Sequence, residues 1–266
     1  MSQGRVRVWW ALLLSLCVAS ARAQSAQAVI QLAVNTERAA NQNDHSNWAY
    51  LEEIRKPKEH VVQWVAATQA GNVERVIRRN DERLTAPQQQ EMIQKFLHDG
   101  KMQRKQITEN DHDNKQVDDL LKLLPQAFRW TQTDANPTDT FLHFEPDPNF
   151  HPPTREARVF SAMAGDVTVD NQQHRIRSMS GRLIEEVTFG GGLLGKLKKG
   201  SSFSLEQAQV GESLWQLTSL HVHLDGNALL FKSISLDQDD ERSKFSAEAA
   251  GITLNQAASL VMTFAD

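Results

Sequence analysis

A run of strand-like segments begins with RVFSAMAGDVTVD at residues 158–170 and ends at Leu236. It continues through QHRIRSMSGRLIEEVTFG (173–190), SSFSLEQAQV (201–210), SLWQLTSLHVHLDG (213–226) and NALLFKSISL (227–236). Apolar and polar residues alternate in much of it, for example over Val167–Asp170 and Leu220–Leu224. Successive side chains of a strand point to opposite faces, so this alternation predicts a sheet with one apolar face and one wetter face.

Short links between these segments predict antiparallel pairing, because parallel strands need long crossover connections. Asp225–Gly226 is a hairpin signal, since its residues tolerate the positive φ of a tight turn. Gly165 and Gly181 interrupt two long strands, which predicts a bulge or bend that curls the sheet. The expected fold class is α+β: a strongly curved antiparallel β-sheet, an unclosed β-barrel, with a helical lid.

The remaining segments complete this half-barrel, which we expect over residues 48–246. Three strands are expected before residue 80, and a helical insertion at about residues 86–124, with a polar break over Glu109–Lys115. Pro125 should end that insertion. Asp237–Arg242 is expected to be a solvated turn, and Lys244–Ser246 a last edge strand. Residues 24–47 are predicted to be helical or flexible, and residues 247–266 to form a C-terminal helical tail.

Residues 1–23 have the pattern of a secretory signal peptide. Arg5 and Arg7 precede an apolar run over Val8–Ala19, and Ala21–Ala23 has the small-x-small form of a cleavage site. The expected localisation is therefore periplasmic or secreted, with cleavage after Ala23; a retained membrane anchor is the alternative. After cleavage, no membrane-spanning segment is expected.

Charge and cysteine content exclude several classes of function. The chain has 29 basic and 33 acidic residues, a net charge of −4. Signal cleavage would remove three arginines, leaving 26 basic residues and a net charge of −7. A chain with this charge is not expected to bind nucleic acid, because such binding depends on basic residues that neutralise the phosphates. The single cysteine, Cys17, lies in the signal segment, so the mature chain is predicted to lack disulfides, cysteine-bound zinc and thiol catalysis.

The motifs that suggest catalysis or nucleotide binding are weak. Gly190–Lys196 matches a phosphate-binding glycine loop, but Leu197 follows in place of Ser or Thr and no helix comes after it. His221 and His223 lie on one face of a strand and could supply two metal ligands, although a third is not evident. No Gly-x-Ser-x-Gly elbow occurs. We therefore expect no catalytic residue, no resident metal and no cofactor.

Large apolar residues are spread over the strands and are candidates to line a cavity under the lid. Ordinary core packing is the alternative for all of them. The expected lining, inferred from alternation, is Trp130, Phe144, Met163, Trp215, Leu217 and Phe231.

The order of these parts, with the meander segments 165–170, 176–183, 187–190 and 200–203, resembles the superfamily of periplasmic carriers that sort outer-membrane lipoproteins. The resemblance is nearest to secreted bacterial members with no assigned activity. It implies a half-barrel that holds acyl chains between a concave sheet and helices, without catalytic residues. The expected partner is thus a lipid or lipoprotein. An envelope sensor or scaffold that binds a polypeptide is the alternative, and a metal-dependent hydrolase is a third.

Overall fold

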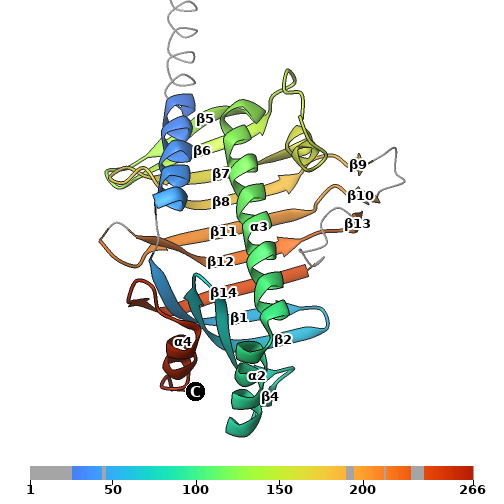
Figure 1. Cartoon of the computed structure of the whole chain (residues 1–266). Coiled ribbons are helices and arrows are strands. Elements are labelled where there is room, and N and C mark those ends of the chain that lie inside the picture. The colour runs from blue at the N-terminus through green and yellow to red at the C-terminus, as the bar shows by residue number, and fades with distance from the viewer. Residues whose placement is uncertain (1–25, 44–45, 190–194, 213, 229–236, 266) are drawn as a thin grey trace, which may run out of the picture.

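The computed structural model describes residues 26–43, 46–189, 195–212, 214–228 and 237–265. Within these ranges the chain forms one large antiparallel sheet, a small second sheet and several helices (Figure 1). No helix in the described ranges has the length and apolar character needed to cross a bilayer.

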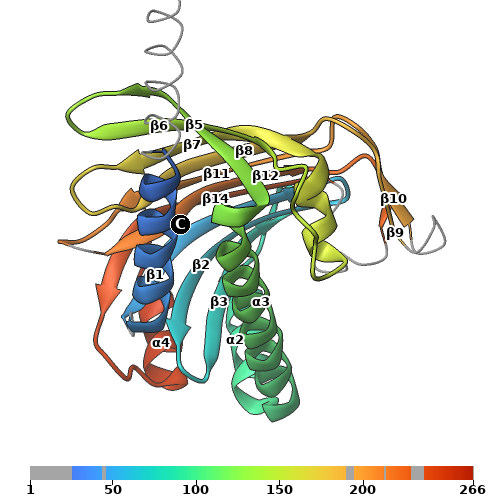
Figure 2. The same ribbon diagram turned by 90° about the horizontal axis from the view of Figure 1, so that it is seen from above.

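The large sheet has 11 strands and is not closed, because β4 and β5 stand at opposite edges. Its spatial order is β4 (Glu82–Arg83), β3 (Gly71–Arg79), β2 (Glu59–Thr68), β1 (Asn47–Lys56), β14 (Asp237–Glu248), β12 (Trp215–His223), β11 (Ser202–Gln209), β8 (Ile176–Leu183), β7 (Met163–Asp170), β6 (Asp139–Pro146) and β5 (Phe128–Ala135). Figure 2 shows that the sheet bows strongly. The expected fold class, α+β with a curved, unclosed antiparallel sheet, is confirmed.

The helices α2 (Ala86–His98) and α3 (Gly100–Ala127) meet at Asp99, whose side chain accepts hydrogen bonds from the backbone N–H groups of Lys101 and Met102. A third helix spans residues 26–43. Helix 26–43 and α3 lie on the concave side of the bow, and α3 crosses many strands (Figures 1 and 2). We call the face turned toward α3 the inner face of the sheet, and the opposite one the outer face.

Apolar residues form two cores on different faces of the sheet. The first lies on the inner face of β5 to β11, where helix 26–43, α3 and the short 3-10 helix η1 (Glu156–Ala162) pack. The second lies on the outer face of β1 to β3, where α2 and α4 (Leu254–Val261) pack around Trp64. The rings of Trp64 and Phe264 are stacked, with their centroids 4.2 Å apart. The inner face of β14, β1, β2 and β3 is therefore not part of either core.

Two expectations about the helical insertion are wrong. The polar run Glu109–Lys115 does not break the helix, because α3 is continuous and exposes its residues 111–115 to solvent. Polar residues are favourable on a helix face that is turned to solvent. The (i, i+4) ion pair Lys105–Glu109 further stabilises this part of α3. Pro125 lies within the last turn of α3 and does not end it.

The acidic run Asp237–Arg242 is not a turn, and the segment after it is not an edge strand. Both belong to β14, which lies between β1 and β12. Its charges are accommodated because neighbouring strands offer partners, for example Glu52 for Arg242. Gly226 also does not close a hairpin with β12. It begins β13 (Gly226–Ala228), which pairs with β10 (Gly195–Leu197) in a small sheet completed by β9 (Val187–Phe189).

The paired glycines Gly165 and Gly181 serve close packing, and no register shift occurs at them. A Cβ at Gly165 would lie 1.9 Å from the Ser180 carbonyl oxygen and 2.7 Å from the Phe144 ring. A Cβ at Gly181 would lie 2.6 Å from the Phe203 ring. The missing side chains thus let large neighbours lie across the inner face of the sheet.

Candidate functional site

An apolar cavity of about 310 Å³ lies between α3 and the inner face of the sheet. Among its lining residues are Leu120 and Leu124 of α3, Phe160 of η1, Met163 of β7 and Phe203 of β11. Ser201 and Ser202 are the polar residues of its described lining. Its volume is in the range of sites that hold small molecules, and its chemistry favours an apolar guest.

A wider cavity of about 1010 Å³ adjoins the apolar cavity and reaches helix 26–43. The two share five lining residues: Val117, Leu121, Met179, Leu205 and Leu220. The wider cavity adds polar groups such as Gln173 and Gln216. Together the two form one hollow that is apolar at its inner end and mixed at its outer end.

The candidate lining residues fall into three groups. Met163 lines the apolar cavity, and Trp215 and Leu217 line the wider one. Trp130 and Phe144 lie beside them in the core, in an aromatic cluster with Phe128. Neither is among the described lining residues of the two cavities. Phe231 lies outside the described residues.

Sequence reasoning missed all five lining residues that the two cavities share: Val117, Leu121, Met179, Leu205 and Leu220. The signal was available for Val117 and Leu121, whose helical spacing predicted an apolar stripe that faces the sheet. Leu205 and Leu220 occupy directly opposite positions of β11 and β12, which alternation alone could not bring together.

Helix 26–43 is held against the sheet by a buried ion pair. Two guanidinium nitrogens of Arg175, Nε and Nη2, donate hydrogen bonds to the Glu37 carboxylate, at 3.0 and 2.9 Å. Glu37 also accepts the backbone N–H of Ile176 at 2.7 Å. A second pair, from Arg38 to Asp118 at 2.6 Å, joins this helix to α3. These contacts fix two walls of the wider cavity relative to the sheet.

A polar patch continues the inner face beyond the cavities. It consists of Tyr50, Glu52, Gln63, Glu74, Gln238, Asp240 and Arg242, which alternation and register place on the inner face of β1, β2, β3 and β14. Arg242 donates to Glu52 at 3.0 Å and to Asp240 at 3.0 Å. Burial, and then the Asp240 carboxylate, raise the pKa of Glu52.

Glu74 is the member of this patch that titrates near neutral pH. Glu74 is exposed, and it lies on the inner face of β3 near the Gln106 side chain of α3. Loss of water around it, and then the nearby Glu52 carboxylate, raise its pKa to about 7, with Arg79 acting in the opposite direction.

Replacing Glu74 by Gln should therefore stabilise the protein at pH 8 and have little effect at pH 5. A raised pKa means that the native state prefers the neutral carboxyl, so native stability falls as pH rises from 4.5 to about 7. Allowing for solvent screening, we expect a gain of about 1 kcal/mol at pH 8. Urea unfolding at both pH values checks this, with Glu91→Gln on α2 as the control. An equal effect at both pH values would contradict the assignment.

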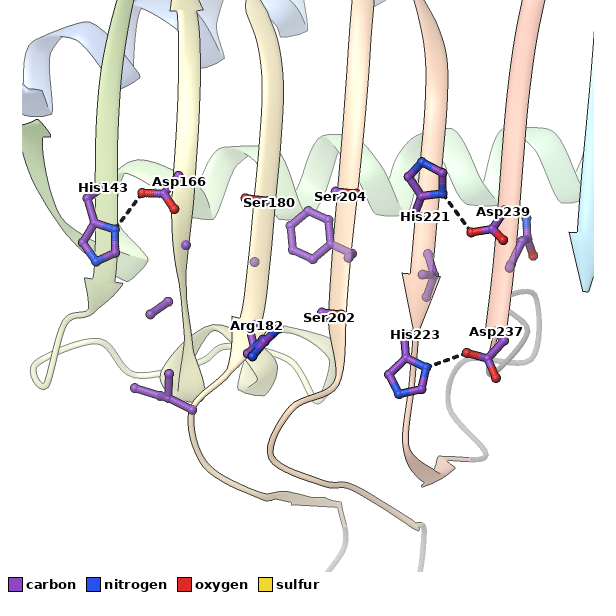
Figure 3. A pocket seen from close by; sticks show the side chains of 17 residues that line it. His143, Asp166, Ser180, Arg182, Ser202, Ser204, His221, His223, Asp237 and Asp239 are labelled. Atoms are coloured by element: carbon purple, nitrogen blue, oxygen red, sulfur yellow. Dashed lines mark hydrogen bonds and ion pairs between the residues drawn. The ribbon is translucent and has the colours of Figure 1, made fainter. Parts of the chain in front are cut away.

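The outer face carries a row of histidines and acids around a shallow cavity of about 580 Å³ (Figure 3). Register places six polar residues directly opposite one another from β6 to β14: His143, Asp166, Ser180, Ser204, His221 and Asp239. His143 contacts Asp166 at 2.9 Å, His221 contacts Asp239 at 2.8 Å, and His223 contacts Asp237 at 2.5 Å. Each imidazole thus has its own carboxylate, and the described residues contain no grouping of three or more suitable metal ligands.

Ser219, His221 and Asp239 have the outline of a hydrolytic triad, since Ser219 Oγ lies 2.9 Å from His221 Nε2. However, the Ser219 hydroxyl donates to Glu241 at 3.1 Å. The Glu241 carboxylate therefore competes with His221 Nε2 for the one proton of Ser219, whereas a general base must receive that proton itself. Ser219 is also buried inside the sheet between two neighbouring strands, where backbone N–H groups bond to the adjacent strands and are not available to an oxyanion.

Comparison with solved structures finds a distant likeness to the crystal structure of a DUF1329 family protein from Desulfovibrio piger ATCC 29098. The two chains are 9% identical, the match covers 86% of this chain and 95% of that one, and the TM-score is 0.31. A TM-score this low carries no argument about fold or function. No model of a known protein family matches the chain, and no curated protein matches it.

Proposed function

We propose that the protein binds a molecule with an apolar chain in the hollow between α3, helix 26–43 and the inner face of the sheet. The observation that carries this proposal is the apolar cavity, which adjoins a wider and more polar one across five shared lining residues. A guest that is apolar at one end and polar at the other matches this gradient. Binding would rest on burial of the chain, at roughly 0.8 kcal/mol per methylene.

In this proposal the protein acts as an exported carrier and not as an enzyme. The signal-peptide pattern of residues 1–23 supports export, and the resemblance to lipoprotein-sorting carriers supports an acyl chain as the guest.

Val117→Asp should weaken binding of dodecan-1-ol about tenfold while leaving the fold intact. Val117 lines both cavities, so a carboxylate at this position would contact the guest. Because Val117 is 51% exposed, the substitution should cost little stability. Equilibrium dialysis gives the affinity, and circular dichroism the fold.

The matched control is Met102→Asp. Met102 lies on the same helix, is 43% exposed and is outside the described lining of both cavities, so dodecan-1-ol affinity should stay at the wild-type value. Equal affinities for the wild type and Val117→Asp would count against the proposed site.

A further inference from the structure

Two side-chain oxygens on the inner face of β14 are buried without a hydrogen-bond partner among the described residues. They are Oδ1 of Asp240 and Oε1 of Gln238. Asp240 is 5% exposed, and its other oxygen accepts from Arg242. A buried acceptor without a donor is unfavourable, so these two atoms indicate that something else supplies donors at this place.

Both residues stand directly beside the cavity wall. Asp240 is opposite Leu220 on β12, and Gln238 is opposite Val222, each on the same face of the sheet. Leu220 lines both cavities and Val222 lines the apolar one. Directly opposite residues of an antiparallel pair have Cβ atoms about 5 Å apart, so Asp240 and Gln238 lie one strand beyond residues that line the cavities.

The charge at this place is negative. Glu52 and Asp240 share the guanidinium of Arg242, which donates to both, and Glu74 lies near Glu52 on the same face. Arg79 acts on Glu74 more weakly than Glu52 does. A group that brings both positive charge and N–H donors would satisfy these oxygens, whereas a carboxylate or phosphate would be repelled.

We propose that the guest carries a primary ammonium group at one end of its apolar chain, and that this group lies against Asp240 and Gln238. The inference rests on the proposed function, because the cavity must first hold the chain. A primary ammonium has three N–H donors and no acceptor, which matches the two free oxygens and the excess of carboxylates. A quaternary ammonium has the charge but no donor and matches only in part.

The test compares probes that share one chain and differ in their head group: dodecylammonium, dodecyltrimethylammonium, dodecan-1-ol and dodecanoate. Equilibrium dialysis of the full chain at pH 7.5 gives the four affinities. Dodecylammonium should bind about tenfold more tightly than dodecan-1-ol, as one charge-assisted hydrogen bond provides. Dodecyltrimethylammonium should bind less tightly than dodecylammonium, and dodecanoate should be the weakest.

Asp240→Asn should lower the affinity for dodecylammonium about tenfold and change that for dodecan-1-ol less than twofold. The matched control is Asp239→Asn, which alters the next residue of β14 on the outer face and should change neither affinity. If Asp240→Asn does not fold, the head-group series on the wild type still decides the matter.

The outcomes separate the two proposals. If dodecan-1-ol binds but dodecylammonium shows no advantage, water satisfies the two oxygens, and the head-group inference is overturned while the chain site stands. If none of the four probes binds, both are overturned. An advantage that persists in Asp240→Asn also overturns the placement of the ammonium group.

Discussion

Dodecan-1-ol should bind about 200-fold more tightly than octan-1-ol, because four further methylenes are buried at roughly 0.8 kcal/mol each. The expectation follows from the apolar cavity of about 310 Å³ that continues into the one of about 1010 Å³. We expect one chain to pass between the cavities beside their five shared lining residues, among them Val117, Leu121 and Leu205. A chain that stayed at the surface would gain much less for each methylene.

Equilibrium dialysis of the alcohol series with eight, ten and twelve carbons gives the slope of binding free energy against chain length. Leu205→Trp is the matched variant, because it fills the opening between the cavities and should flatten that slope while short alcohols still bind. Affinities that do not depend on chain length in the wild type would rule out burial of the chain.

Arg175→Met should lower the free energy of unfolding by about 3–5 kcal/mol, since it leaves the Glu37 carboxylate buried without its partner. The side chains of Glu37 and Arg175 are 5% and 7% exposed, and two hydrogen bonds join them. The Glu37 carboxylate would keep only the Ile176 backbone N–H as a donor from the protein. Urea unfolding followed by circular dichroism measures the change.

Two comparisons show whether the loss comes from an unpaired buried charge. The double variant Glu37→Leu with Arg175→Met should recover most of the stability, because an apolar pair of similar volume has no charge to desolvate. Arg38→Met breaks the pair with Asp118, whose side chains are each 27% exposed, and should cost about 1 kcal/mol or less. A double variant as unstable as Arg175→Met would show that another contact is responsible.

Part of the hollow could be predicted from the sequence. Alternation in the meander identified an apolar face, and Met163, Trp215 and Leu217 do line a cavity. Trp130 and Phe144 follow the same alternation but lie in an aromatic cluster instead. Alternation predicts which face of the sheet a side chain occupies. Whether that side chain packs against protein or borders a cavity depends on elements distant in the chain.

The polar patch beside the hollow could not be predicted. Asp237–Arg242 has the composition of a solvated turn, and its place in a strand follows from pairing with β1 on one side and β12 on the other. β1 and β14 are separated by most of the chain, so no local pattern could reveal that Asp240 lies opposite Ile54 in the interior of the sheet.

The amino-acid sequence by itself determined the strands, their antiparallel pairing with near neighbours and the helices, because these depend on side-chain alternation and spacing within a few residues. Only the tertiary structure decided that β14 lies in the middle of the sheet, that α3 runs unbroken across it, and which apolar side chains border empty space. Those features depend on contacts between segments far apart in the chain, where bowing of the sheet and the packing of α3 and helix 26–43 determine the distances.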